Sequence, residues 1–306
     1  MTPVAADRGR AAAVPPEVLR QVRRIELRTR GLVNSRFTGE YHSVFKGMGM
    51  EFAEVREYQP GDEVRTIDWN VSARMQRLFV KRFVEERELT VLLIVDTSGS
   101  SRGGALAQDK QGMAAELAAV LALTATRNND RVGLLLHSDR VEHVVPPRKG
   151  RRHALRLVRD VLASRAQARG TDLAAACDYA ARLLPHRSIV FVVSDFVAPD
   201  FDRALTRLSR RHDVVAVVLD DPAERELPDV GVARLQDAES GELAEIDTSD
   251  PRVRARYAAA LNAEREARQS MLRRLAVDEV IVPLEVGYVD PLMRFFRARE
   301  TRARRR

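Results

Sequence analysis

A short apolar run that ends abruptly in polar residues constrains the fold of this chain more than any other feature. Residues 89–95 read L-T-V-L-L-I-V and carry no charge, a pattern typical of a strand buried on both faces of a parallel sheet. Asp96 and the hydroxyl residues Thr97, Ser98 and Ser100 follow at once. Because open α/β sheets bind ligands beyond the carboxyl ends of their strands, we expect the functional site here.

Strand and helix patterns alternate along the chain after this run. Apolar runs at 189–193 and 214–219 predict further buried strands, and amphipathic helical spacing recurs between the predicted strands. Only Ser138 and Asp139 separate the strand patterns at 132–137 and 140–145, which predicts a tight antiparallel hairpin. The alternation therefore predicts an α/β fold: a doubly wound, mostly parallel sheet with one antiparallel edge hairpin and helices on both faces.

Further segments are predicted before and after the sheet domain in the chain. Alanine, arginine and proline dominate the first residues, which predicts disorder, whereas 15–30 has helical spacing and 39–49 is typical of a loop. A helix beginning at Asp250 and Pro251 is followed by a possible last strand at 280–283. The predicted division is a disordered N-terminus (1–14), an N-terminal region with short strands (15–88), the sheet domain (89–248) and a C-terminal helical segment (249–306).

The N-terminal region contains a stretch of closely spaced opposite charges. Extended pieces are predicted at 55–58 and 64–69, on either side of a turn at Pro60 and Gly61. The charges lie at Arg56, Asp62, Arg65, Asp68, Arg74 and Lys81. Two interpretations stay open: an internal ion-pair network with Trp69 inserted into the core, or a docking surface for a partner.

Composition narrows the classes of partner and compartment. The chain has 51 lysines and arginines against 44 acidic residues, but the arginines are spread along it and aromatic residues make up only 5%. This distribution favours a solvated surface over a nucleic-acid site. The lone Cys177 falls at helical spacing with apolar residues, which predicts a buried, inert thiol and a reducing compartment. Without a long apolar segment or signal-peptide pattern, we expect a soluble cytoplasmic protein with no membrane span.

Three polar clusters lie at predicted strand ends or in the loops joined to them. They are Asp96-x-Ser98-x-Ser100, Gly170-Thr171-Asp172 and Ser194-Asp195. Parallel strands bring their carboxyl ends to one edge, so the clusters can converge there. Two of these carboxylates together with three of these hydroxyls suit Mg²⁺ or Mn²⁺, which prefer oxygen ligands and retain water. With few carboxylates around it, the ion would keep a net positive charge, and a carboxylate of another protein could complete its coordination.

These clusters resemble the metal-ion-dependent adhesion site (MIDAS) of von Willebrand factor type A domains. Longer phrases resemble the bacterial family called domain of unknown function 58: G-M-G-M-E-F-A-E-V-R-E-Y-Q-P-G-D-E-V-R-T-I-D-W at 47–69, S-A-R at 72–74, V-K-R-F-V-E-E-R at 80–87 and S-D-F at 194–196. The resemblance implies a von Willebrand factor A-like fold with metal bound, directly or through water, by Asp96, Ser98, Ser100, Thr171 and Asp195. It also implies a non-enzymatic protein-binding role as an adaptor or partner of a MoxR-type AAA+ ATPase, in complex assembly or chaperone-like activity. Ser101 departs from the family pattern, which often has Met there.

A serine hydrolase is the alternative function. Residues 99–103 match G-x-S-x-G, and Asp195 and His212 follow Ser101 in the chain order of an α/β-hydrolase triad. Three residues intervene between the predicted strand end and the first glycine, which weakens the match to a nucleophile elbow. The remaining histidines show no metal-ligand spacing and are predicted at the surface or in turns: 42, 137, 143, 153 and 186.

Overall fold

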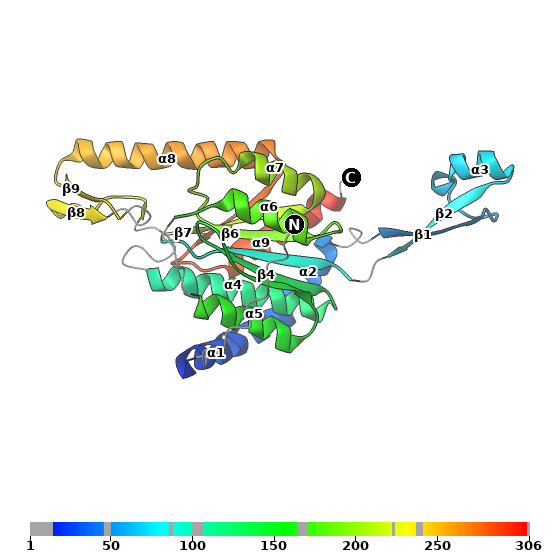
Figure 1. The fold of residues 1–306 in the computed structure, drawn as a ribbon, viewed down its shortest axis with the longest axis horizontal. Helices are drawn as coiled ribbons and strands as arrows, with labels where there is room; N and C mark the ends of the chain where they lie inside the picture. The colour runs from blue at the N-terminus through cyan, green and yellow to red at the C-terminus, as the bar shows by residue number, and fades with distance from the viewer. Residues whose placement is uncertain are drawn as a thin grey trace, which may run out of the picture.

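A six-stranded sheet in the order β10-β7-β6-β3-β4-β5 forms the centre of the molecule (Figure 1). The computed structural model describes residues 15–45, 50–85, 88–99, 107–164, 170–221, 224–236 and 241–304, so the predicted disorder at 1–14 lies outside it. The strands of the sheet are β3 (Thr90–Asp96), β4 (Arg131–His137), β5 (Val141–Arg148), β6 (Ile189–Ser194), β7 (Asp213–Asp220) and β10 (Asp278–Pro283). Only the β4–β5 pair within this sheet is antiparallel. The predicted doubly wound fold with one antiparallel edge hairpin is confirmed.

Alternate residues of β3 face two separate apolar cores. Val91, Leu93 and Val95 contribute to one core, and Leu92 and Ile94 to the other. The first core is covered by α1 (Pro16–Leu32), η1 (Val33–Phe37), α2 (Thr38–Phe45), α4 (Ala107–Arg127), α5 (Arg151–Ala163) and α9 (Val289–Arg304), and the second by α6 (Leu173–Leu183), α7 (Asp202–Arg211) and α8 (Pro251–Arg274). Each fully buried aliphatic side chain contributes roughly 1.5–3 kcal/mol, so both faces need their helical layer.

Part of the segment predicted as a loop at 39–49 is helical. Residues 38–45 form α2, because Tyr41 and Phe45 are buried against the first core. The Phe45 ring lies 6.4 Å from that of Phe191 on β6 and 6.2 Å from that of Phe296 on α9. Tertiary packing of these aromatic side chains therefore outweighs the turn-like local composition.

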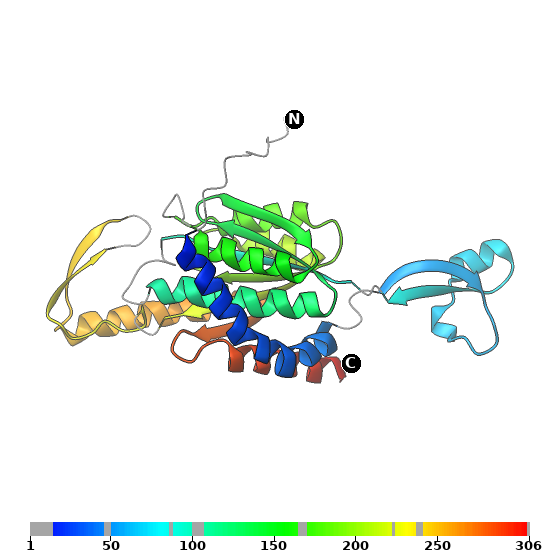
Figure 2. The same ribbon diagram turned by 90° about the horizontal axis from the view of Figure 1, so that it is seen from below.

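An arm (residues 50–85) projects from one end of the molecule (Figures 1 and 2). It pairs β1 (Met50–Glu57) with β2 (Phe79–Glu85) and carries η2 (Val64–Thr66) and α3 (Trp69–Met75). The extended piece predicted at 64–69 is wrong for residues 64–66, which form η2, and for Trp69, which begins α3; Asp68 caps this helix by accepting hydrogen bonds from the amides of Asn70 (3.0 Å) and Val71 (3.2 Å). Trp69 is 64% exposed, so its predicted insertion into a core is also wrong.

A second pair of strands lies at the opposite end of the molecule (Figure 1). This β8–β9 hairpin consists of β8 (Val232–Gln236) and β9 (Leu243–Asp247), which pair with each other and form their own sheet. The predicted start of α8 is confirmed: Asp250 accepts a hydrogen bond from the Arg252 amide (2.8 Å), and Pro251 is the first helical residue. The predicted last strand at 280–283 is confirmed as part of β10.

Charged side chains form hydrogen bonds with one another at the amino edge of the sheet. Arg299 donates two hydrogen bonds to Asp213, at 2.6 and 2.7 Å, and a third to Asp278 at 2.5 Å. Its guanidinium also lies over the rings of Phe45 and Phe295. These contacts tie α9 to the first residues of β7 and β10.

In the described part of the chain, no helix has both the length and the apolar character of a membrane span.

Asp130, beside the amino end of β4, is a buried acid in this region. Its carboxylate accepts hydrogen bonds from the Tyr41 hydroxyl (3.0 Å) and the Leu89 amide (2.8 Å). Burial raises the pKa of Asp130 to about 6, although both hydrogen bonds act in the opposite direction. A raised carboxyl pKa means that the folded state binds this proton more tightly than the unfolded state does.

We expect Asp130→Asn to change how stability depends on pH. In the wild type, the stabilisation linked to the Asp130 proton is complete below pH 4 and is lost as the pH rises toward 6. The difference in unfolding free energy between wild type and Asp130→Asn should therefore fall from pH 4 to pH 6 and stay level above it. Urea unfolding across this range measures the difference, and a difference that rises with pH would contradict the assignment.

Candidate functional site

Asp96 lies at the carboxyl end of β3, between β4 and β6. It is 6% exposed and pairs in register with His137 of β4. One carboxylate oxygen accepts a hydrogen bond from the Ser98 amide (2.8 Å), and the other accepts one from the Ser194 hydroxyl (2.8 Å). Two neighbouring elements therefore fix the orientation of this carboxylate at the point where the chain connections diverge to either side of β3.

The loop before α6 reaches the same edge of the sheet. The Asp172 amide donates a hydrogen bond to the carbonyl of Ser138 (2.7 Å), the residue that follows β4. Asp172 also caps α6 by accepting a hydrogen bond from the Ala175 amide (2.8 Å). These contacts place Thr171 beside the end of β4, next to the strand that carries Asp96.

The loop after β6 carries Asp195 and contains a strained residue. The Asp195 carboxylate accepts a hydrogen bond from the Val197 amide (3.0 Å), and the Ser194 hydroxyl accepts one from the Phe196 amide (3.0 Å). Phe196 has a φ of 61°, in the left-handed region that bulky residues rarely adopt. Such strain persists only where the surroundings enforce it, and it is concentrated at functional sites.

The structure brings four of the five predicted metal ligands to one edge of the sheet. Asp96 and Ser98 are joined directly, Asp195 follows the serine that bonds to Asp96, and Thr171 lies in the adjoining loop. The fifth ligand, Ser100, lies outside the described residues. Sequence reasoning missed the role of Ser194 in orienting Asp96. Asp96 and Ser194 each come directly after a predicted apolar strand, and this shared position could have indicated it.

An ion pair with one buried partner connects α4 to the loop after β7 near this edge. Lys110 is 2% exposed, and its ammonium lies 2.5 Å from the Glu224 carboxylate. Burial raises the pKa of Glu224, the nearby Asp221 and Asp195 raise it further, and Lys110 lowers it. Glu224, Asp221 and Asp195 therefore lie close enough to affect one another, and Lys110 is a buried positive charge beside them.

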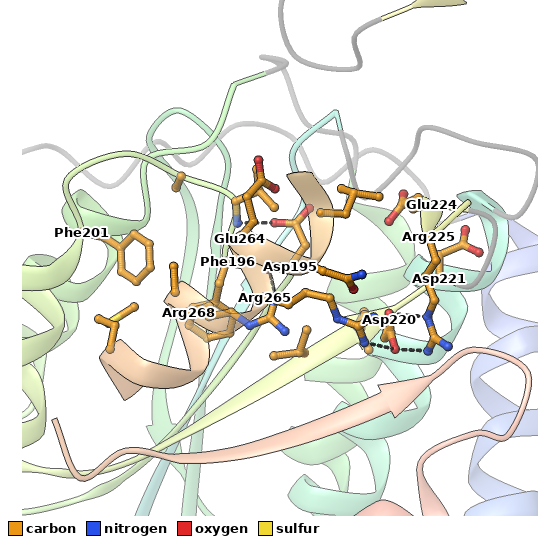
Figure 3. A pocket seen from close by; sticks show the side chains of 18 of the residues that line it. Asp195, Phe196, Phe201, Asp220, Asp221, Glu224, Arg225, Glu264, Arg265 and Arg268 are labelled. Atoms are coloured by element: carbon orange, nitrogen blue, oxygen red, sulfur yellow. Dashed lines mark hydrogen bonds and ion pairs between the residues drawn. The ribbon is translucent and has the colours of Figure 1, made fainter. Parts of the chain in front are cut away.

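A groove of about 580 Å³ lies between the carboxyl edge of the sheet and α8 (Figure 3). Its walls are the loop 195–202, the end of β7 with the loop after it, and the α8 residues 261–271. Arg268 of α8 donates hydrogen bonds to Glu279 (3.0 Å) and to the carbonyl of Asp195 (3.5 Å). Arg265 and Arg225 both pair with Asp220. Sequence patterns alone did not predict this groove, because α8 is distant in the chain from β6.

The geometry excludes the predicted hydrolase triad. Asp195 follows the carboxyl end of β6, whereas His212 precedes the amino end of β7. Because Ile189 pairs with Asp213 in the parallel β6–β7 ladder, the two residues lie at opposite edges of the sheet. At about 3.3 Å per strand residue, six residues separate them by roughly 20 Å. The hydrolase alternative, with Asp195 and His212 serving Ser101, is therefore wrong; Ser101 itself lies outside the described residues.

The structure contradicts the predicted surroundings of His137 and confirms those of Cys177. His137 was predicted at the surface or in a turn, but it is completely buried at the end of β4, beside Asp96. Cys177 is buried as predicted, and burial raises the pKa of its thiol to about 12. A thiol with so high a pKa is protonated at neutral pH and is a poor nucleophile.

We expect Ser194→Ala to destabilise the fold by about 2 kcal/mol, because it removes a hydrogen bond to a buried carboxylate. Ser209→Ala is the matched control, since the Ser209 hydroxyl bonds only within its own helix at 3.2 Å. It should cost less than about 0.5 kcal/mol. Urea denaturation of both variants measures the difference. Equal losses would show that the Ser194–Asp96 contact does not stabilise this edge.

The solved structures that match this chain share little sequence with it. An aerotolerance-related membrane protein from Bacteroides fragilis has 16% identity and a TM-score of 0.46, with 70% of this chain and 99% of that chain covered. A von Willebrand factor type A protein from Catenulispora acidiphila has 14% identity and a TM-score of 0.32, with 44% and 33% covered.

Sequence comparison gives a closer relationship. An uncharacterized protein of Mycobacterium tuberculosis is 33% identical over 288 residues, which cover 93% of this chain and 90% of that protein. An uncharacterized protein of Bacillus subtilis is 42% identical over 48 residues, 16% of this chain and 12% of the relative. The model of the family described as protein of unknown function DUF58 matches residues 54–267. The chain therefore belongs to the DUF58 family, as the sequence motifs predict.

Proposed function

We propose that this protein is a non-enzymatic, metal-dependent protein-binding module whose site is the carboxyl edge around Asp96. The observation that carries the proposal is the buried Asp96 carboxylate, oriented by Ser98 and Ser194 at the switch point of the sheet. An acid in this position is a suitable anchor for a divalent cation. The strained Phe196 beside it supports a binding role for the same edge.

The side chains around Asp96 fit a magnesium or manganese ion. Among the described residues, no three His, Cys, Asp or Glu side chains converge on one point. The proposed ligands are instead two carboxylates, Asp96 and Asp195, with the hydroxyls of Ser98, Ser100 and Thr171, as the resemblance to metal-ion-dependent adhesion sites implies. Mg²⁺ accepts such a set, because it is commonly held by one or two carboxylates and keeps several waters.

A cation bound by so few carboxylates would supply net positive charge for an acidic side chain of a partner protein. The groove between the sheet and α8 adjoins Asp195, so a partner that reaches the cation would also contact the groove. The buried Lys110 offsets the negative charge of Glu224 nearby. The attraction for an acidic side chain would therefore come from the cation, since six carboxylates and only three arginines line the groove.

We further propose a MoxR-type AAA+ ATPase, or a client of that ATPase, as the partner. The support is membership of the DUF58 family, together with the resemblance of the site to metal-dependent adhesion sites. The lone, buried Cys177 is compatible with the reducing cytoplasm, where we place this function.

We expect wild-type protein to bind one Mg²⁺ or Mn²⁺ per chain, and Asp96→Asn and Asp195→Asn to lose binding. Asparagine at 96 retains hydrogen-bonding groups for Ser98 and Ser194, so the loss would come from the missing charge. Isothermal titration calorimetry of each ion measures the binding, and a magnesium-dependent rise in the unfolding midpoint gives a second readout.

Asp202→Asn is the control for this titration. Asp202 also lines the groove and is exposed, but it is not among the proposed ligands. It should bind metal as the wild type does. The metal site would be refuted by a wild type that binds neither ion, or by Asp96→Asn binding with unchanged affinity.

Magnesium should also control the interaction with the partner. We expect the purified protein to bind a MoxR-type ATPase of the same organism in Mg²⁺, and to release it in EDTA or on Asp96→Asn substitution. Surface plasmon resonance measures the binding. If the metal binds but EDTA leaves the complex intact, the partner uses a different surface; if no complex forms at all, the proposed partner is wrong.

A further inference from the structure

Two surfaces outside the lining of the groove expose large apolar side chains. Among the described residues, four of these belong to the arm: Val64, Trp69, Met75 and Leu78. Three belong to the β8–β9 hairpin and its base: Val230, Val232 and Leu243. The hairpin is a two-stranded sheet on its own, whereas the exposed apolar residues of the arm lie on η2, on α3 and just before β2. Small isolated sheets are only marginally stable, and their open edges invite pairing with another chain.

The two surfaces lie at opposite ends of the long axis of the molecule (Figures 1 and 2). Contact between them within one chain would have to cross the whole central sheet. Contact between two copies needs only that the end of one molecule meets the other end of the next. An arrangement of this kind joins two different surfaces, and it closes into a ring or pair or continues as an open chain.

The segment of the arm that carries its exposed apolar residues is complementary in charge to the hairpin, although the arm as a whole has seven acidic and six basic residues. Residues 64–78 of the arm contain three arginines and one aspartate, and that aspartate pairs with Lys81 at 3.4 Å. In the described part of the chain, Arg65 and Arg74 are exposed and have no ion-pair partner. Residues 229–247 contain six acidic residues and one arginine. Opposite charge on two apolar surfaces favours their association and disfavours contact of either surface with itself.

The acidic charge of the hairpin is accessible. Glu245 is 63% exposed even though it pairs with Arg234 at 2.8 Å, and Asp229 is 62% exposed beside Arg254. Exposed ion pairs of this kind contribute little to stability, so their carboxylates can exchange partners at low cost. The hairpin thus offers carboxylates beside exposed valine and leucine, and the arm offers arginines beside exposed tryptophan and methionine.

We propose that the arm of one molecule binds the β8–β9 hairpin of a second copy, so that the protein self-associates through its two ends. Trp69 with Arg65 and Arg74 forms one half of the contact. Val232 and Leu243 with the surrounding carboxylates form the other half. The contact leaves Asp96 and the groove beside α8 outside the interface, so it is independent of the proposed metal site.

Sedimentation velocity of the full chain tests this contact. Concentrations from about 1 µM to about 500 µM cover the range expected for a small interface. The wild type should sediment as a 34.4 kDa monomer at the lowest concentration and as a dimer or larger species at the highest. Trp69→Ala/Arg74→Glu, which alters the arm, and Val232→Lys/Leu243→Lys, which alters the hairpin, should each stay monomeric.

An equimolar mixture of the two variants is the decisive sample. Each variant keeps one intact half of the contact, so the mixture should regain dimers, and species larger than a dimer should be absent. Leu27→Lys is the matched control, since Leu27 on α1 is 65% exposed, like Leu243 at 61%, but lies on neither surface. It should associate as the wild type does. A monomeric wild type, a mixture that stays monomeric, or a single variant that still associates would overturn the proposal.

Discussion

The burial of β3 on both faces is the constraint on which the rest of the structure depends. The side chains from Val91 to Asp96 are buried, so the strand needs a neighbour on each side and a helical layer above and below. A parallel sheet meets these needs only through crossover helices, which return every strand in the same direction. The polar residues after β3 and β6 must then meet at one edge. The position of the candidate site therefore follows from the burial of β3 on both faces.

Local sequence predicted the central sheet because its strands are short apolar runs with abrupt polar ends. The same reasoning failed in the N-terminal region, where local and tertiary preferences diverge. Residues 38–45 contain a glycine and polar residues, but Tyr41 and Phe45 gain more from packing as a helix. At 64–69 the β-branched residues suggested a strand, whereas Asp68 supplies a helix cap. The exposure of Trp69 could not be predicted from the neighbouring sequence. The charged residues around it fit both an internal ion-pair network and a docking surface.

The candidate site was predictable to the extent that it depends on strand ends. Asp96, Ser98 and Asp195 are placed by the parallel topology, whereas Thr171 is placed by the hydrogen bond between its neighbour Asp172 and Ser138. Features that depend on packing were not predictable. The groove requires α8 to lie against the loop after β6, through Arg268 and its contacts with Glu279 and the Asp195 carbonyl. The burial of His137 likewise follows from the helix layer covering β4, which single-residue spacing does not reveal.

The length of α8 links the groove to the tip of the molecule. With 24 residues at 1.5 Å each, the helix is about 36 Å long, and its amino end carries the β8–β9 hairpin. Its other end forms a wall of the groove. By the geometry of such a rod, a tilt of about 10° about the groove end moves the far end by about 6 Å. In a rigid helix of this length, a small change in groove width would become a large displacement of the hairpin.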